Sequence, residues 1–216
     1  MRRPSIAICL AGWLAVTANS EMVDRIAVSV GSRVITETDL DREIRITALL
    51  NSEKPDFSPS NKRTAAERMV DQTLVRSELE VSRYLPPSAA DVEAALQEEK
   101  TRFGDDAAYR GALTQYGVTE DDLKARLTWQ LTLVRFIDVR FRTGIQIGDT
   151  EILKYFDEHM RAALVQAHPG QTPSVDDYRA NIEQTLIGQA ADQQAEQWLK
   201  EARQRTRIQY HDEVFR

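Results

Sequence analysis

Histidines and carboxylates are the residues of this sequence that could carry metal-dependent or acid–base chemistry. The three histidines are His159, His168 and His211. None of them has a second ligand at the spacing of known zinc motifs. Acidic residues gather at 105–106 and 120–122, but each cluster precedes an expected helix, where carboxylates complement the positive end of the helix dipole. These patterns favour incidental histidines and helix-capping acids, and we expect no metal and no other cofactor.

Signatures of common enzymes are missing from the sequence. It contains no G-x-S-x-G nucleophile motif, phosphate-binding loop, dinucleotide-binding glycine motif or zinc-protease helix. A catalytic pair of carboxylates would therefore have to be assembled by the tertiary structure. We expect a protein that is not an enzyme and that does not use ATP.

The first twenty residues differ from the rest of the chain. Two arginines open this segment, an apolar run follows at 6–16, and small residues end it at Ser20. This order predicts a secretory signal peptide over 1–20, because the apolar run is shorter than the roughly 20 residues of a membrane span. An uncleaved anchor is the alternative. The only cysteine, Cys9, lies in this segment, so the exported part would have no disulfide.

Acidic residues outnumber basic ones. Without residues 1–20 the chain carries 26 basic and 34 acidic residues, a net charge of −8. Nucleic acids and anionic membranes select stripes of lysine and arginine, and the sequence contains no such run. We therefore expect neither a nucleic acid nor a membrane as a partner, and no membrane span after signal cleavage.

The elements that would position any functional residue are mostly helices. Residues 23–50 predict a β-hairpin that leads directly into a helix, because apolar residues alternate at 26–30 and a glycine turn follows. Four helix starts are indicated by a serine or threonine with an acid three residues later. These pairs are Thr38/Asp41, Ser88/Asp91, Thr119/Asp122 and Ser174/Asp177. We expect a mainly α fold with a small β-sheet.

The hairpin needs a further strand, because two strands alone are marginally stable in water. We expect that strand at 207–210, which would bring both ends of the exported chain into one sheet. The helix before it, at 174–204, carries apolar residues on one side of its first half and on another side of its second half. Such a helix should pack against different partners at its two ends.

Three stretches of the sequence resemble a known family of periplasmic chaperones. The stretch VDRIAVSVGSRVITETDL at 23–40 is similar to the first strands and helix of mature SurA-like and PrsA-like chaperones. The stretch IGDTEILKYF at 147–156 resembles the helix that precedes their isomerase domain, and residues 174–210 resemble their closing helix and strand.

The resemblance implies one SurA-N-like chaperone domain at 21–216. Its hairpin and helices would occupy 23–160, and the closing helix and strand 174–210. The family places a parvulin prolyl-isomerase domain between these parts, but the gap is too short for a domain of about 50 residues. The resemblance therefore implies the chaperone module without the isomerase.

The same resemblance implies a periplasmic, ATP-independent holdase for unfolded exported polypeptides, above all outer-membrane proteins. Helices at 61–83 and 119–142 each carry two apolar stripes, whereas a helix at the surface of a core needs one. Surplus apolar surface marks binding sites, although plain core packing explains the same pattern. The predicted peptide contacts are Met69, Val75, Leu79, Trp129, Leu133 and Phe136. The free edge of the small sheet offers a second way to bind an extended client.

Two other functions stay open on the sequence alone. The apolar surface could serve a dedicated assembly subunit that recognises one folded partner. A prolyl isomerase is the lesser alternative, since no motif carries its chemistry. The closing helix and strand could also exchange between two copies, which would give a swapped homodimer.

Overall fold

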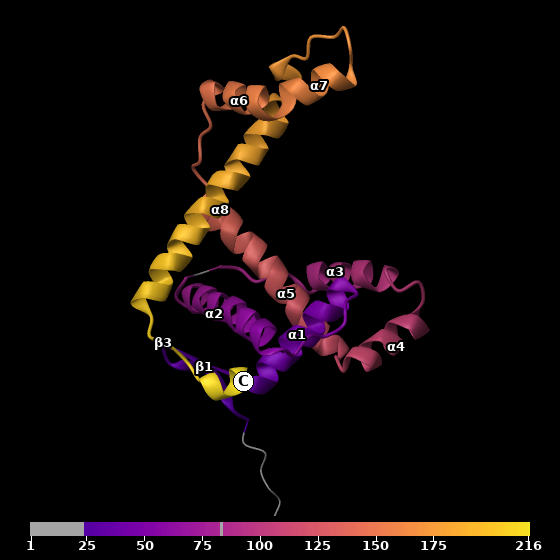
Figure 1. The fold of residues 1–216 in the computed structure, drawn as a ribbon, viewed down its shortest axis with the longest axis vertical. Coiled ribbons are helices and arrows are strands. Elements are labelled where there is room, and N and C mark those ends of the chain that lie inside the picture. The colour runs from indigo at the N-terminus through magenta and orange to yellow at the C-terminus, as the bar shows by residue number, and fades with distance from the viewer. Residues whose placement is uncertain (1–23, 83) are drawn as a thin grey trace, which may run out of the picture.

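The computed structural model describes residues 24–82 and 84–216. The expected signal peptide at 1–20 lies outside the described residues. The fold is mainly helical with one small antiparallel sheet (Figure 1), which confirms the predicted fold class. The strands are β1 (Ile26–Val30), β2 (Arg33–Thr36) and β3 (Ile208–Tyr210). The helices are α1 (Glu37–Asn51), α2 (Pro59–Val81), α3 (Ala89–Thr101), α4 (Asp106–Tyr116), α5 (Glu120–Ile137), α6 (Asp149–Tyr155), α7 (Arg161–Ala167) and α8 (Arg179–Arg205).

The sheet joins the two ends of the described chain. Its order is β2-β1-β3, and β1 pairs antiparallel with both neighbours. Val28 lies opposite Tyr210, and the backbone N–H of Gly31 donates to the carbonyl of Arg207 at 2.9 Å. Gly31 has a φ of +59°, a conformation that glycine adopts without steric cost. The predicted return of the last strand to the hairpin is confirmed.

The first helix begins two residues earlier than the sequence signature indicated. Thr36 ends β2 in an extended conformation, so its hydroxyl accepts a hydrogen bond from the N–H of Asp39, whose carboxylate accepts from Thr36 in return. Thr38 already lies in the first helical turn, so the pair Thr38/Asp41 does not cap α1. The capping box is present, but it is formed by Thr36 and Asp39, because β2 ends at Thr36.

Two of the other predicted helix starts are confirmed. Ser88 and Thr119 each form a capping box with the acid three residues later, at the starts of α3 and α5. The prediction for Ser174 is wrong, because its hydroxyl accepts from the N–H of Asp176 and opens a single 3-10 turn. The helix α8 itself begins at Arg179 without a side-chain cap.

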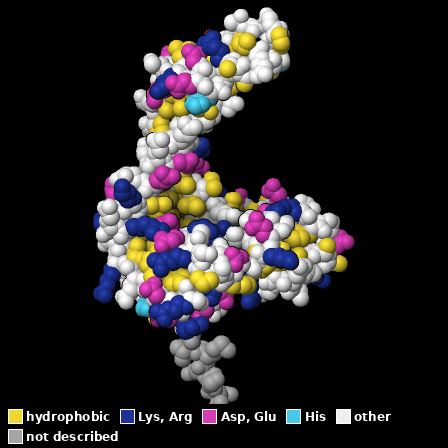
Figure 2. All heavy atoms as spheres, in the orientation of Figure 1, with side chains coloured by type: hydrophobic (Ala, Val, Ile, Leu, Met, Phe, Trp, Pro, Cys, Tyr) yellow, Lys and Arg dark blue, Asp and Glu magenta, His cyan; other side chains and the backbone are white. Residues whose placement is uncertain are grey.

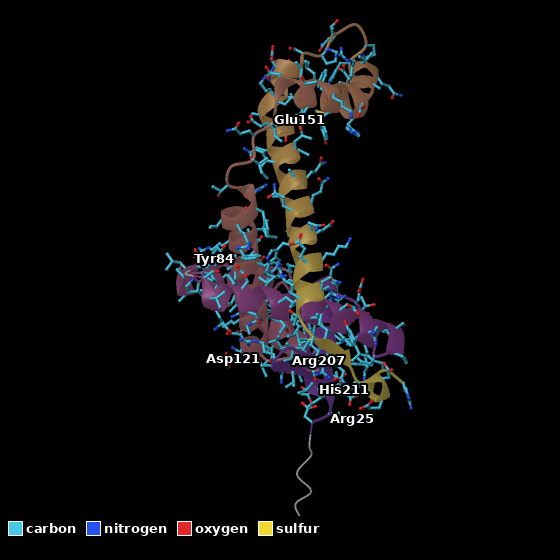
Figure 3. The ribbon with its side chains drawn as sticks, turned by 90° about the vertical axis from the view of Figure 1, so that its left-hand side faces the viewer. Arg25, Tyr84, Asp121, Glu151, Arg207 and His211 are labelled. Atoms are coloured by element: carbon cyan, nitrogen blue, oxygen red, sulfur yellow. The ribbon has the colours of Figure 1, made fainter. Side chains whose placement is uncertain are left out.

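Helices α1 to α5 and the sheet form a body, and α6 and α7 lie at the far end of α8 as an arm (Figure 1). In a side view, Arg25, Arg207 and His211 lie together at the base of the body, whereas Glu151 lies in the arm (Figure 3). Residues 161–173 form α7 and a loop.

The long helix α8 packs against different partners along its length, as its apolar pattern predicted. Its first half contributes Ile182 to a small arm core with Ile152 and Phe156. Its second half contributes Ala191 and Trp198 to a core shared with α5. The body core lies under the sheet and contains residues of β1, β2, α1 and α2.

Candidate functional site

Two adjoining hollows lie between α2 and α5. The α1-side hollow has a volume of about 190 Å³ and is bounded by α1. The α8-side hollow has a volume of about 360 Å³ and reaches Leu199 of α8. Both are lined by Gln72, Arg126 and Trp129, so these three side chains form their common boundary.

Apolar side chains line the α8-side hollow. Val75 comes from α2, Leu133 from α5 and Leu199 from α8. Trp129 lies one helical turn before Leu133, so both project from the same face of α5. The remaining lining is polar: Arg68, Asp71, Gln72, Arg126 and Gln130. Such a surface can receive an apolar side chain while polar groups remain available to a bound backbone.

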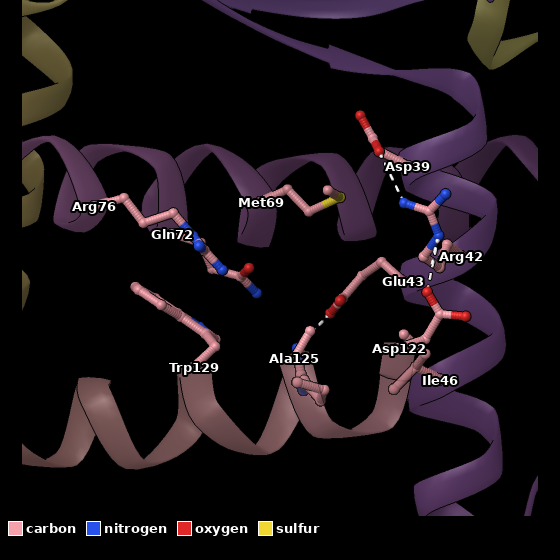
Figure 4. Close-up of a pocket in the computed structure, with 11 residues that line it drawn as sticks. Asp39, Arg42, Glu43, Ile46, Met69, Gln72, Arg76, Asp122, Ala125 and Trp129 are labelled. Atoms are coloured by element: carbon pink, nitrogen blue, oxygen red, sulfur yellow. Dashed lines mark hydrogen bonds and ion pairs between the residues drawn. The ribbon is translucent and has the colours of Figure 1, made fainter. Parts of the chain in front are cut away.

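Ion pairs line the α1-side hollow (Figure 4). Glu43 of α1 accepts a hydrogen bond from Nη1 of Arg126 at 2.7 Å. Arg42 lies 3.3 Å from a carboxylate oxygen of Asp39 and 3.3 Å from one of Asp122. The acids of this hollow therefore already have arginine partners.

Arg76 differs from the other arginines of the α1-side hollow. Its guanidinium lies over the ring of Trp129, 4.5 Å from the centroid. Partial burial lowers the pKa of Arg76, and the nearby Arg33 lowers it further. Among the described residues, no side-chain hydrogen bond or ion pair includes Arg76. Glu43 acts on Arg76 only through space and partly offsets the lowering of its pKa, so stacking on the indole is the direct contact that holds this cation.

The structure brings four of the six predicted contact residues to the hollows. Met69 lines the α1-side hollow, Val75 and Leu133 line the α8-side hollow, and Trp129 lines both. Val75 and Trp129 are only 3% and 6% exposed and belong to the same buried cluster as Phe136. They are therefore core residues beside the hollow, and the prediction that they present an open surface to a client is wrong.

Phe136 and Leu79 lie outside the hollows. Phe136 is 2% exposed and makes edge-to-face contacts with Tyr84, Phe141 and Trp198 at centroid distances of 5.5, 5.6 and 5.5 Å. Leu79 packs against the same cluster. The prediction that Phe136 presents a surface to a client is therefore wrong, because α8 covers this face of α5. Leu79 belongs with it to the core.

Sequence reasoning missed Arg76, Arg126 and Leu199. Arg76 has an acid, Glu80, four residues later, a spacing at which a helix forms an ion pair. The structure gives Glu80 to Arg33 of the hairpin instead, which leaves Arg76 free to turn toward Trp129. Leu199 did have a signal, since it lies on the apolar stripe of the closing helix.

The acids and the histidine that could carry chemistry make contacts typical of structural residues. Asp105 accepts a hydrogen bond from the N–H of Ala108 and caps α4, and Asp122 completes the box that starts α5. The ring Nε2 of His211 lies 3.3 Å from the hydroxyl of Ser29. Within 24–82 and 84–216, histidines and acids form no group of three or more that could hold a metal ion.

Comparison with models of known protein families finds no match, and comparison with curated protein sequences finds none either. In the part of the chain that the structure describes, no helix is both long and apolar enough to cross a membrane.

Proposed function

We propose that this protein is an ATP-independent periplasmic holdase, related to the SurA-like and PrsA-like chaperones, that binds unfolded exported polypeptides such as outer-membrane proteins. The observation that carries the proposal is the α8-side hollow. Leu133 of α5 and Leu199 of α8 are half-buried and supply its accessible apolar wall, whereas Val75 and Trp129 line it as buried residues. Open apolar surface of this kind binds side chains of many sequences, because its contacts are non-directional.

The shape of the molecule supports the same proposal. The arm stands away from the body along α8, so the surface between them is concave (Figures 1 and 2). Hydrophobic side chains reach the surface over the body and near its junction with the arm (Figure 2). A client segment in this concavity would be shielded from other unfolded chains without being folded.

An edge of the sheet offers the extended backbone of a client a second contact. β2 lies at one edge of the sheet, and its Val34 is exposed. An added strand would gain main-chain hydrogen bonds that do not depend on client sequence. The surface charge of −8 without the leader keeps such a carrier soluble.

Aggregation of an unfolded β-barrel precursor, followed by light scattering, tests the proposal. The purified protein should suppress aggregation at micromolar concentration without ATP. Leu133→Ser should raise the concentration needed severalfold, because a hydroxyl replaces an apolar wall of the hollow. Val134→Ser is the matched control: it is the next residue of α5, 58% exposed, and lies outside the lining, so its activity should equal that of the wild type.

Other outcomes would favour the other functions. Failure to bind any unfolded chain, with one stoichiometric folded partner recovered instead, would identify an assembly subunit. Proline isomerisation of a test peptide above background would indicate an isomerase. Cell fractionation tests the periplasmic location, which rests on the expected signal peptide.

A further inference from the structure

We propose that the α1-side hollow binds the C-terminal carboxylate of an extended polypeptide, with Arg76 and Arg126 as the donors. The inference rests on the proposed holdase function and specifies which part of a client this surface recognises. It follows from unused donors, from paired acids and from the way α1 bounds the hollow.

Arg126 supplies the first unused donor. The side chain is 18% exposed and spends Nη1 on Glu43. Its Nε is buried and has no hydrogen-bond partner among the described residues. A ligand in the hollow cannot reach this buried nitrogen, but Nη2 of Arg126, which makes no hydrogen bond among the described residues, is available to an acceptor there.

Arg76 supplies a whole guanidinium. Its central guanidinium carbon lies 4.5 Å from the centroid of the Trp129 ring. Arg33 pairs with Glu80, the acid that helical spacing would otherwise bring to Arg76. Arg76 is exposed and lines the hollow, so its guanidinium is accessible to a carboxylate that enters there. In the close-up, Arg76 extends toward Gln72 in the gap between α2 and α5 (Figure 4).

The charges around these donors select a carboxylate. Glu43, Asp39 and Asp122 already pair with Arg126 or Arg42. A planar carboxylate fits the fork of a guanidinium and carries one negative charge. A doubly charged phosphate would meet stronger repulsion from Glu43, which lines the same hollow.

The position of α1 selects a chain terminus. Four residues of α1 line this hollow, and α1 crosses the end of the gap between α2 and α5 (Figure 4). A polypeptide that reaches the arginines from the α8 side would meet α1 and could not continue in the same direction. The volume of about 190 Å³ suits one terminal residue, since a cavity of roughly 150 Å³ accommodates benzene. The apolar residue before it would face the α8-side hollow.

Two peptides of one apolar sequence test this, one ending in a free carboxylate and one in an amide. Binding of fluorescent peptides to the purified protein is measured by anisotropy at neutral pH. The acid should bind about tenfold more tightly than the amide, as expected for charge-assisted hydrogen bonds. The net charge of −8 acts against the acid, so a preference for it requires a local cationic site.

Arg76→Gln should abolish the preference for the acid and leave the affinity for the amide unchanged. Arg110→Gln is the matched control, because Arg110 lies on α4, has a side chain that is 76% exposed and lines neither hollow. It should keep the tenfold preference. A third peptide ends in an amide and contains one internal glutamate. It shows whether the site binds a side-chain carboxylate as well as the carboxylate of a chain terminus.

Equal binding of acid and amide to the wild type would overturn the carboxylate site. Binding of the internal-glutamate peptide as tightly as the acid would overturn the assignment to a chain terminus. If neither peptide binds but precursor aggregation is still suppressed, the carboxylate site is refuted and the holdase function stands. If aggregation is not suppressed, the holdase function itself is refuted.

Discussion

Replacing Phe136 by alanine should destabilise the whole protein, even though sequence reasoning placed this residue at a binding surface. The side chain is fully enclosed and touches three aromatic rings, one of which belongs to α8. Truncation of a buried phenylalanine to alanine costs about 3–5 kcal/mol through lost burial and the cavity left behind. Each edge-to-face pair adds about 0.5–1.5 kcal/mol beyond burial, partly contained in that figure. We expect a loss of about 4 kcal/mol, a large share of the roughly 5–15 kcal/mol that stabilises a domain.

Urea unfolding followed by helical circular dichroism and by tryptophan fluorescence measures this loss. Trp198 packs on Phe136, so its emission should report the loosened contact between α5 and α8. Val134→Ala, on an exposed position of the same helix, should change the free energy of unfolding by less than about 0.5 kcal/mol. A loss below about 1 kcal/mol for Phe136→Ala would show that α8 does not seal this core.

Two further changes probe local conformation and charge. Gly117→Ala should destabilise by about 1 kcal/mol or more in urea unfolding, because alanine is strained at a φ of +63°. The end of the Arg45 side chain, 2.9 Å from the new Cβ, can move away. Gly111→Ala, inside α4 with open space around it, should instead stabilise slightly, and an effect of the same sign for both changes would contradict the role of the positive φ. Lys62→Met should destabilise the protein at pH 7 and not at about pH 2. The hydrogen bond from Lys62 lowers the pKa of Glu37. The stabilisation from this pair is therefore present above the ordinary carboxyl pKa and is lost as the pH falls through the lowered pKa of Glu37. An equal deficit at both pH values would exclude this pair as the cause.

The helical fold and the closure of the sheet could be predicted from local chemistry. Hydroxyl–acid pairs, glycine turns and alternating apolar residues act within a few positions of the chain, so they identify the starts of α3 and α5 and the hairpin. The pairing of β3 with β1 was inferred from the instability of an isolated hairpin rather than from any pattern in 207–210. The register of the first cap was missed because it depends on where β2 ends.

The charged half of the candidate site could not be predicted in the same way. Helical spacing assigns Glu80 to Arg76, and only tertiary structure gives Glu80 to Arg33. Likewise, Glu43 and Arg126 form a pair between α1 and α5 although the two residues are 83 positions apart in the sequence. Long-range partners of this kind decide which arginine has no acidic partner. A periodic sequence pattern does not predict these long-range pairs.

Periodicity also does not predict which of the two apolar faces of α5 another helix will cover. The covered face becomes part of the core, and the other face lines the hollow. The choice is made by α8, which Arg203 holds on α2 through Glu67 and Asp71 at 2.6 and 2.7 Å. Consecutive residues of α8 then serve both purposes, because Trp198 seals the Phe136 cluster while Leu199 forms a wall of the α8-side hollow. Moving α8 to widen the hollow would expose that aromatic cluster to water, at a cost of several kcal/mol. The hollow is therefore a preformed surface, and a polypeptide bound there would have to adapt to it rather than open it.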